Sequence, residues 1–210
     1  MNYVRTIATG GSREIVIKKS RFICTLHRAA TEEEARTFID ELKKRYWDAN
    51  HNCSAYRIGP GGSHQRSNDD GEPSGTAGTP MLAVLNKRDL TDTVAVVTRY
   101  FSGIMLGAGG LVRAYGQAVT ETVEVVGIVE RRPLNLVAFD ANHADAGRLE
   151  NALRVAGYTL GPISHTAHVT FEIRLAPPDI PAFEVWLAET TNGRSRARIA
   201  GEVFVEVPVA

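Results

Sequence analysis

The pattern of apolar and polar residues at the start of the chain predicts two strands followed by a helix. Residues 14–17 and 21–26 carry strand signals, and the second segment alternates apolar with polar side chains. Thr31 and Glu34 then form a T-x-x-E capping box, a common start signal of a helix. The apolar side chains that follow recur at helical spacing and predict one buried face, made of Ala35, Phe38, Ile39, Leu42 and Tyr46.

Residues 59–79 interrupt this pattern, between a strand predicted at 52–58 and a short helix near 81–87. They contain six glycines, two prolines and hardly any large apolar residue, so we expect a structureless loop. A loop of that length inside a compact domain is usually functional or disordered. The continuous apolar run at 93–101 then predicts a strand buried on both faces.

A glycine-rich run at 103–110 leads into a long helix. Glycines there permit phosphate binding at the helix N-terminus, but close packing of helix against sheet explains them equally well and is the interpretation we favour. The run lacks the lysine of a P-loop and does not match G-x-G-x-x-G. The apolar face of the helix is predicted to comprise Leu111, Tyr115, Ala118, Val119, Thr122 and Val126.

The Arg131-Arg132-Pro133 segment predicts a domain boundary, because proline disfavours continuing the helix. We therefore expect two domains, residues 1–132 and 133–210. The elements after the boundary are a strand at 134–140, a helix ending at Gly157, strands at 158–165 and 167–175, a helix capped by Asp179, and a strand at 196–207. This βαββαβ order is that of a ferredoxin-like fold, and the whole chain is predicted to be α+β.

Composition and charge limit where in the cell the protein is expected and which class of partner it is expected to bind. No run approaches the roughly 18 apolar residues of a membrane span and no signal peptide is present, so we expect a cytoplasmic protein without membrane contact. Cys24 and Cys53 lie in apolar, strand-like surroundings and are predicted to be buried thiols. The net charge is zero, which argues against a generic polyanion binder. Residues before Pro133 carry a net charge of 18 − 15 = +3, and residues after it carry a net charge of 6 − 9 = −3. If the protein binds RNA, the N-terminal half is therefore the half expected to face it.

The segment Asn68 to Gly78 concentrates carboxylates, hydroxyls and glycines and is the first candidate functional loop. Its residues of interest are Asp69, Asp70, Gly71, Glu72, Pro73, Ser74 and Gly75. The three carboxylates are ligands suited to a hard cation, yet the spacing of an EF-hand is absent, so neither a metal site nor a cofactor is predicted. The simpler alternative is a turn-rich loop whose side chains bond their own backbone.

Arg99-Tyr100-Phe101 closes the buried strand and suits base stacking combined with phosphate contact. An equally good alternative is one core aromatic, one half-exposed tyrosine and a structural salt bridge. We expect this segment, the 69–78 loop and the 103–110 run to share a single surface patch, with Arg113 and Arg66 as further phosphate contacts.

Catalysis is the alternative hypothesis. Ser74 with His51 or His64 and Asp70 would be the simplest triad, and Cys53 with His51 the simplest dyad. Neither sits on a nucleophile elbow, and residues 51 and 53 would point to the same face of one strand. A small-molecule hydrolase or peptidase therefore ranks behind a binding function.

Three segments closely resemble the signature stretches of the YigZ/IMPACT family: His51-Asn-Cys-Ser-Ala-Tyr-Arg57, Asp69 to Gly78, and Val97 to Gly116. The resemblance implies an N-terminal domain of the ribosomal protein S5 domain 2-like type and a C-terminal ferredoxin-like domain, both similar to domains of elongation factor G. It points to a regulatory role in translation, with RNA or the ribosome as partner, or a protein partner of the translation machinery. The RWD domain of eukaryotic members is missing, so their partnership is not carried over.

Two residues depart from the family motif Arg-Tyr-Phe-Gly-Gly-Ile-Lys-Leu-Gly. Ser102 replaces its first Gly, and Met105 replaces its Lys. The second change removes a cation beside the glycine turn and leaves Arg99 and Arg113 as the nearby cations.

Overall fold

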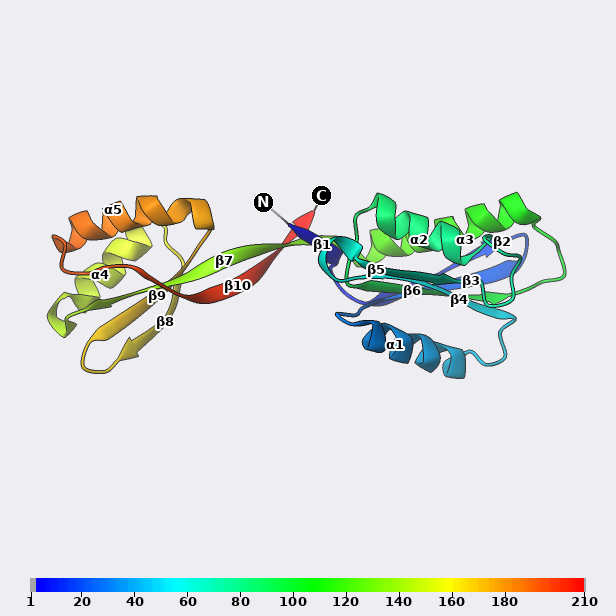
Figure 1. Cartoon of the computed structure of the whole chain (residues 1–210), viewed down its shortest axis with the longest axis horizontal. Coiled ribbons are helices and arrows are strands. Elements are labelled where there is room, and N and C mark those ends of the chain that lie inside the picture. Colours follow the sequence, from blue (N-terminus) through cyan, green and yellow to red (C-terminus); the bar gives the residue numbers. More distant parts are fainter. Residues whose placement is uncertain (1–2, 210) are drawn as a thin grey trace. The chain divides into compact units, whose positions relative to one another are not determined.

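The computed structural model describes residues 3–209, which form two compact units. The first unit runs up to Arg131 and includes the chain from Glu206 onward, and the second comprises Arg132–Val205. Both units combine a sheet with helices (Figure 1), which confirms the predicted α+β class. Within the described residues, the helices are too short or too polar to cross a membrane.

The first unit is built on a five-stranded sheet of order β2-β3-β6-β4-β5, in which every neighbouring pair is antiparallel. Helix α1 covers one face, and α2 and α3 cover the other (Figure 1). The bounds are β1 Val4–Ile7, β2 Gly11–Ile17, β3 Ser20–Arg28, α1 Glu32–Arg45, β4 His51–Ile58, β5 His64–Asn68, α2 Gly78–Lys87, β6 Thr93–Tyr100 and α3 Ala108–Val126.

The central strands carry a core on each face because their side chains alternate. Phe22 and Cys24 of β3 point toward α3, where the Phe22 ring meets Tyr115 edge-on with ring centroids 5.3 Å apart. Tyr56 of β4 points the other way and packs under α1. Cys24 and Cys53 are both buried and unpaired by a disulfide, which confirms the prediction for the thiols.

The prediction of a structureless loop at 59–79 was wrong in its first half. A short 3₁₀ turn at Pro60–Gly62 reverses the chain, and β5 then pairs with β4 in the register Tyr56↔Arg66. Arg57 fixes the turn by donating a hydrogen bond of 2.8 Å to the Gly61 carbonyl. Because all five residues of β5 are polar and exposed at the sheet edge, the strand has no apolar alternation to reveal it.

The second unit has the predicted βαββαβ order. Its elements are β7 Ile128–Ala141, α4 His143–Val155, β8 Leu160–His165, β9 Val169–Leu175, α5 Ile180–Thr191 and β10 Arg198–Val209. Phe139, Phe171 and Phe183 stack in its core, with the first two ring centroids 5.2 Å apart. Strand β9 pairs with β7 and β8, and β10 also pairs with β7.

Strand β7 begins at Ile128, six residues before the start predicted at Leu134. Its residues 128–131 pair with the unpredicted strand β1, and its residues 135–141 pair with β9. Pro133 falls between these two ladders, where a missing N–H breaks neither of them.

Candidate functional site

Three segments that are distant in the sequence meet where β6 ends. The loop after β5, the residues Arg99 and Phe101, and the turn into α3 line one pocket of about 340 Å³. His51, at the start of β4, also lines it. The expected convergence of loop, arginine, phenylalanine and glycine turn on one surface is therefore confirmed.

Tyr100 is the exception, because successive side chains of a strand point to opposite faces. Arg99 lies in register with Phe22 on the α3 face of the sheet. Tyr100 lies on the α1 face, where its hydroxyl donates a 2.9 Å hydrogen bond to Asp48 and Arg21 covers its ring. The expectation that Tyr100 and Phe101 share a patch with Arg99 was wrong for Tyr100.

Arg99 is buried and neutralised. Only 4% of the residue is exposed, and its Nη1 donates a 2.6 Å hydrogen bond to Glu72 Oε1. Its guanidinium carbon lies 5.3 Å from the Phe22 ring centroid and 5.1 Å from that of Phe101. The structural salt bridge that the sequence left open is thus present, and Arg99 holds Phe101 in place at the pocket wall.

Glu72 joins the loop to the core. Its Oε1 accepts hydrogen bonds from Arg99 and, at 2.7 Å, from the Tyr115 hydroxyl. Burial, reinforced by the neighbouring Cys53 and Glu72, raises the pKa of Tyr115, so this hydroxyl remains a donor. No described residue hydrogen-bonds to Glu72 Oε2, and Glu72 lines the pocket. One carboxylate oxygen is thus available to a ligand.

His51 is oriented by the backbone of the same loop. Its Nδ1 lies 2.8 Å from the Asp70 carbonyl oxygen, which can only accept, so Nδ1 carries the proton. Its Nε2 lies 3.9 Å from Glu72 Oε1. In the neutral ring, Nε2 is therefore an acceptor beside the pocket.

The remaining carboxylates of the loop are structural. Asp69 accepts backbone hydrogen bonds from Gly75, Ala77 and Gly78 at 2.8–3.0 Å. Burial works to raise the pKa of Asp69, but these three donors outweigh it and lower the pKa. Asp69 thus matches the turn-forming alternative. Asp70 does not, because its carboxylate accepts from Lys43 Nζ of α1 at 2.6 Å and from the Asn52 N–H of β4 at 2.7 Å.

The Ser74–His51–Asp70 triad does not assemble. The Asp70 carboxylate binds Lys43 and the Asn52 N–H, and only its carbonyl meets His51. Ser74 is exposed, and no hydrogen bond joins it to His51 among residues 3–209.

The Cys53–His51 dyad is absent as well. Burial raises the pKa of the Cys53 thiol to about 12, and its Sγ donates to the Asp69 carbonyl at 3.0 Å. A thiol with that pKa is a poor nucleophile at neutral pH. In the described part of the chain, His, Cys, Asp and Glu side chains form no group of three that could hold a metal ion.

The glycine turn exposes the N-terminus of α3. Gly103 and Gly107 adopt φ of 88° and 73°, which side chains disfavour, and a Cβ on either would meet open space. Gly107 is the N-cap and offers no side chain to the first N–H groups of α3. The N–H groups of the first turn lack intrahelical partners, and Gly107 and Ala108 line the pocket.

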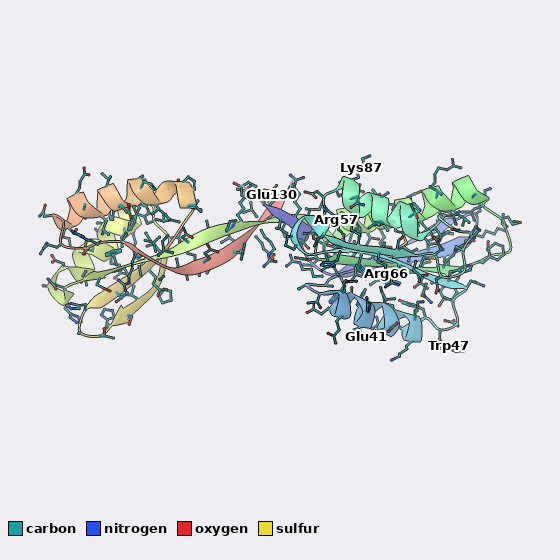
Figure 2. All side chains as sticks on the ribbon, viewed as in Figure 1. Glu41, Trp47, Arg57, Arg66, Lys87 and Glu130 are labelled. Carbon is teal, nitrogen blue, oxygen red and sulfur yellow. The ribbon has the colours of Figure 1, made fainter. Side chains whose placement is uncertain are left out.

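The two other predicted phosphate contacts lie elsewhere. Arg66 is exposed on β5 and lines a separate groove against α1, together with Arg36 and Lys43 (Figure 2). Arg113 is exposed on α3, five residues after the start of the helix at Ala108, and does not line the pocket. Of the five predicted residues, the structure brings only Arg99 and Phe101 together in the pocket.

Sequence reasoning missed the exposed residues at the end of the sheet where the pocket lies, beside the starts of β3 and β4 and the end of β6. Trp47 is 81% exposed just after α1 (Figure 2), and Met105 is 82% exposed in the glycine turn. Lys18 and Lys19 form the turn between β2 and β3, and both have positive φ. We name Lys18, Lys19, Arg21, Trp47, Phe101 and Met105 the tip surface.

Hydrogen bonds hold the segments of the tip surface together. The Ser102 hydroxyl donates to the Lys18 carbonyl at 2.9 Å, and the Phe101 N–H donates to the Asn50 side chain at 2.8 Å. The sequence signal that could have identified the tip surface lies in residues 18–20 (KKS) and 45–50 (RYWDAN). These stretches place lysines and an aromatic residue at the ends of predicted strands and a helix. Only the pairing of β6 with both β3 and β4 brings these two stretches to the same end of the sheet.

Comparison with known proteins identifies the family. Residues 18–123 match the Impact N-terminal domain, and residues 139–194 match a domain of unknown function, DUF1949. A crystal structure titled as a hypothetical protein superposes with a TM-score of 0.61 at 31% identity, covering 95% of this chain and 98% of that one.

Relatives extend from bacteria to eukaryotes. IMPACT family member YvyE of Bacillus subtilis is 49% identical over 97% of this chain and 94% of its own length. IMPACT family member YigZ of Escherichia coli is 35% identical over 84% of this chain and 88% of its own. The Protein IMPACT homolog of Dictyostelium discoideum is 33% identical over 66% of this chain and 39% of its own. The chain belongs to the IMPACT family.

Proposed function

We propose that this protein is a translation-associated regulatory factor whose first unit binds RNA through the tip surface. One observation carries the proposal: exposed aromatic and thioether side chains and two lysines lie at the same end of the sheet as a pocket that has unused hydrogen-bonding groups. Bases stack on aromatic side chains without regard to sequence, and cations beside them neutralise phosphates. RNA bases that are already unstacked are the targets of such surfaces.

Trp47 and Phe101 are the stacking residues in this proposal. Trp47 presents most of its ring to solvent, and Phe101 is fixed by Arg99 beneath it. Lys18 and Lys19 supply the charge next to them, since both are exposed at the β2–β3 turn. Arg113 extends the charge along α3, Arg66 lies in the groove against α1, and Tyr100 is held by Asp48, the residue after Trp47.

The pocket next to the stacking residues would receive one phosphate or base edge. The first N–H groups of α3 donate to anions, as free helix N-termini do. Glu72 Oε2 and His51 Nε2 accept, and thus suit the amino groups of a base edge.

The test exploits the two tryptophans of the chain. In a Trp186→Phe background, Trp47 is the single tryptophan, and stacking of a base on it quenches its fluorescence. Titration with a single-stranded RNA is expected to quench that emission, with affinity falling as salt rises. Trp47→Ala should weaken binding, followed by anisotropy of labelled RNA, by about 1–3 kcal/mol.

Val125→Ala is the matched control, because Val125 is exposed near the far end of α3 and lies outside the tip surface. It should bind RNA like the parent protein. A flat salt response, or equal affinity of the Trp47→Ala protein, would refute the proposal. Capture of a translation-machinery protein by the tip surface, resistant to nuclease, would favour a protein partner instead.

A further inference from the structure

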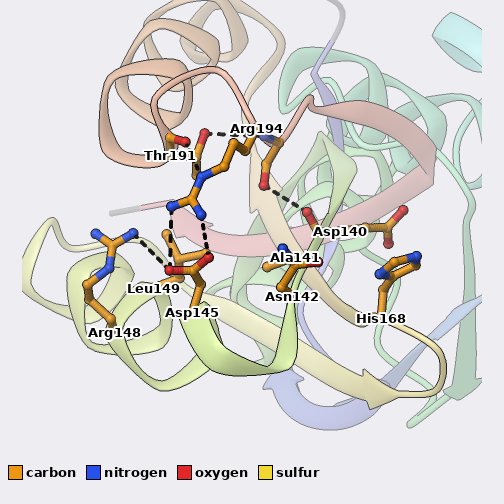
Figure 3. Close-up of a pocket in the computed structure, with 10 residues that line it drawn as sticks. Asp140, Ala141, Asn142, Asp145, Arg148, Leu149, His168, Thr191 and Arg194 are labelled. Atoms are coloured by element: carbon orange, nitrogen blue, oxygen red, sulfur yellow. Dashed lines mark hydrogen bonds and ion pairs between the residues drawn. The ribbon is translucent and has the colours of Figure 1, made fainter.

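A second cleft lies in the second unit, between the start of α4 and the segment that follows α5. It has a volume of about 270 Å³, and Arg148, Arg194, Asp145 and His168 are among its walls. Figure 3 shows the two arginines reaching Asp145 from different elements, with His168 across the opening. The cleft is lined only by residues of this unit, so it is a site separate from the tip surface.

Arginines from distant parts of the second half of the chain meet at the cleft. The chain after Pro133 has six basic residues, all of them arginine, against nine acidic residues. Arg148 and Arg194 line the cleft, and Arg198 binds its wall residue Asp140 at 2.8 Å. A half that is acidic overall therefore places three of its six cations in or beside the cleft.

The two lining arginines are already directed at an anionic group. Arg194 Nη1 lies 2.9 Å from one oxygen of Asp145, and Arg148 Nη2 lies 3.7 Å from the other. Arg194 Nε also donates to the Thr191 carbonyl at 3.0 Å, and Arg148 donates to the Thr190 carbonyl at 3.3 Å. These carbonyl contacts orient both guanidiniums independently of Asp145.

We propose that this cleft binds a terminal phosphate group, which displaces the Asp145 carboxylate from Arg148 and Arg194. A guanidinium carries five N–H donors, so both arginines retain donors beyond those used here. Arginine pairs with phosphate bidentately, and such charge-assisted bonds are the strong ones. Half-exposed ion pairs such as Asp145–Arg194 contribute little, so exchanging the partner costs little.

The competition with Asp145 defines the class of ligand. A carboxylate offers one charge, so a phosphodiester with one charge gains nothing by replacing it. A phosphomonoester carries about 1.5–2 negative charges at neutral pH and has three acceptor oxygens. The cleft is also larger than one phosphate, which leaves room beside Asn142 and His168 for the carrier. The ligand is thus a phosphomonoester or inorganic phosphate rather than an RNA backbone.

The experiment titrates the 210-residue chain with inorganic phosphate, adenosine monophosphate and dimethyl phosphate, and follows binding by the Nε–Hε NMR signals of the arginines. The first two should shift the Arg148 and Arg194 signals, and dimethyl phosphate should bind at least tenfold more weakly. Arg148→Met with Arg194→Met should lower phosphate affinity at least tenfold. Asp145→Asn should raise it severalfold, because the competing charge is gone.

Arg154→Met is the control, since Arg154 lies on the same helix but pairs with Glu150 outside the cleft. It should leave the affinity for phosphate unchanged, and so should Trp47→Ala, which separates this proposal from RNA binding. Equal affinity of the double arginine variant and the parent protein would overturn the site. Equal binding of dimethyl phosphate, or no gain from Asp145→Asn, would overturn the displacement of a carboxylate by a dianion.

Discussion

The same chemical pair, a carboxylate and a guanidinium, occurs in both candidate sites in opposite settings. Glu72 and Arg99 approach to 2.6 Å with side chains only 3% and 5% exposed. Asp145 and Arg194 approach to 2.9 Å with side chains 25% and 53% exposed. Distance alone would rank them alike. Burial decides that the first is part of the fold, whereas the second is available for exchange with a ligand.

The buried pair is expensive to break because removing one partner leaves the other charge buried and uncompensated. Arg99 lies between Phe22 and Phe101, and its Nε has no hydrogen-bond partner. Glu72 is the group that compensates its charge, and Tyr115 ties Glu72 to α3. The core of the first unit therefore preorganises the first site. The stability of that site in turn depends on Glu72, Arg99 and Tyr115 all being present.

Glu72→Gln should produce the largest effect. It keeps the shape and the acceptor for Tyr115 but leaves the Arg99 cation uncompensated, which costs about 3–5 kcal/mol for a buried pair. Urea unfolding followed by circular dichroism measures the loss. Adding Arg99→Met should restore part of the stability, because the orphaned charge is then removed. A loss below about 1 kcal/mol would mean that solvent in the pocket screens the pair as it does a surface pair.

Asp69 should show the next largest effect. In Asp69→Ala the N–H groups of Gly75, Ala77 and Gly78 lose their acceptor, at a cost of about 1–3 kcal/mol. Thermal unfolding at pH 7 measures this loss. The matched variant Asp69→Asn keeps the size of the side chain and an acceptor, and should lose less.

The effect of Asp69 depends on pH with a defined sign. Its backbone hydrogen bonds hold the pKa of Asp69 in the folded protein below the ordinary value despite burial. The contribution of the Asp69 carboxylate to folding stability is therefore present above the unfolded pKa of about 3.9 and is lost as pH falls through the folded pKa. The parent protein and Asp69→Asn should accordingly converge in melting temperature below about pH 4. A difference that stays constant down to pH 2.5 would show that the charge is irrelevant.

Much of the fold follows from local patterns. The capping residue Thr31 accepts the Glu34 N–H at 3.2 Å at the predicted start of α1, and the βαββαβ order of the second unit is as predicted. Strands β1 and β5 were not predictable in this way. Their short or fully polar sequences become strands only because β7 and β4 offer edges to pair with.

The candidate site likewise has a part that local sequence predicts and a part that depends on tertiary structure. Residues 69–75, Arg99 and Phe101 could be selected from the sequence, since their residue types suggest chemistry. Their roles could not, because the one-residue step from Arg99 to Tyr100 changes the face of the sheet. Trp47 and Lys18 join the site only through tertiary hydrogen bonds around Asn50 and Ser102.

Asp145→Asn provides the smallest effect and the sharpest contrast with Glu72→Gln. Both substitutions replace a carboxylate by an isosteric amide beside an arginine, but Arg194 remains half-exposed and hydrated when its partner is neutralised. Exposed pairs contribute about 0–1 kcal/mol, so urea unfolding of the second unit should shift by no more than that. Arg154→Met, which breaks the exposed Glu150 pair, sets the scale for a surface contact. A loss of several kcal/mol would show that Asp145 is a structural residue of the second unit, and its exchange for a phosphate would then be too costly to occur.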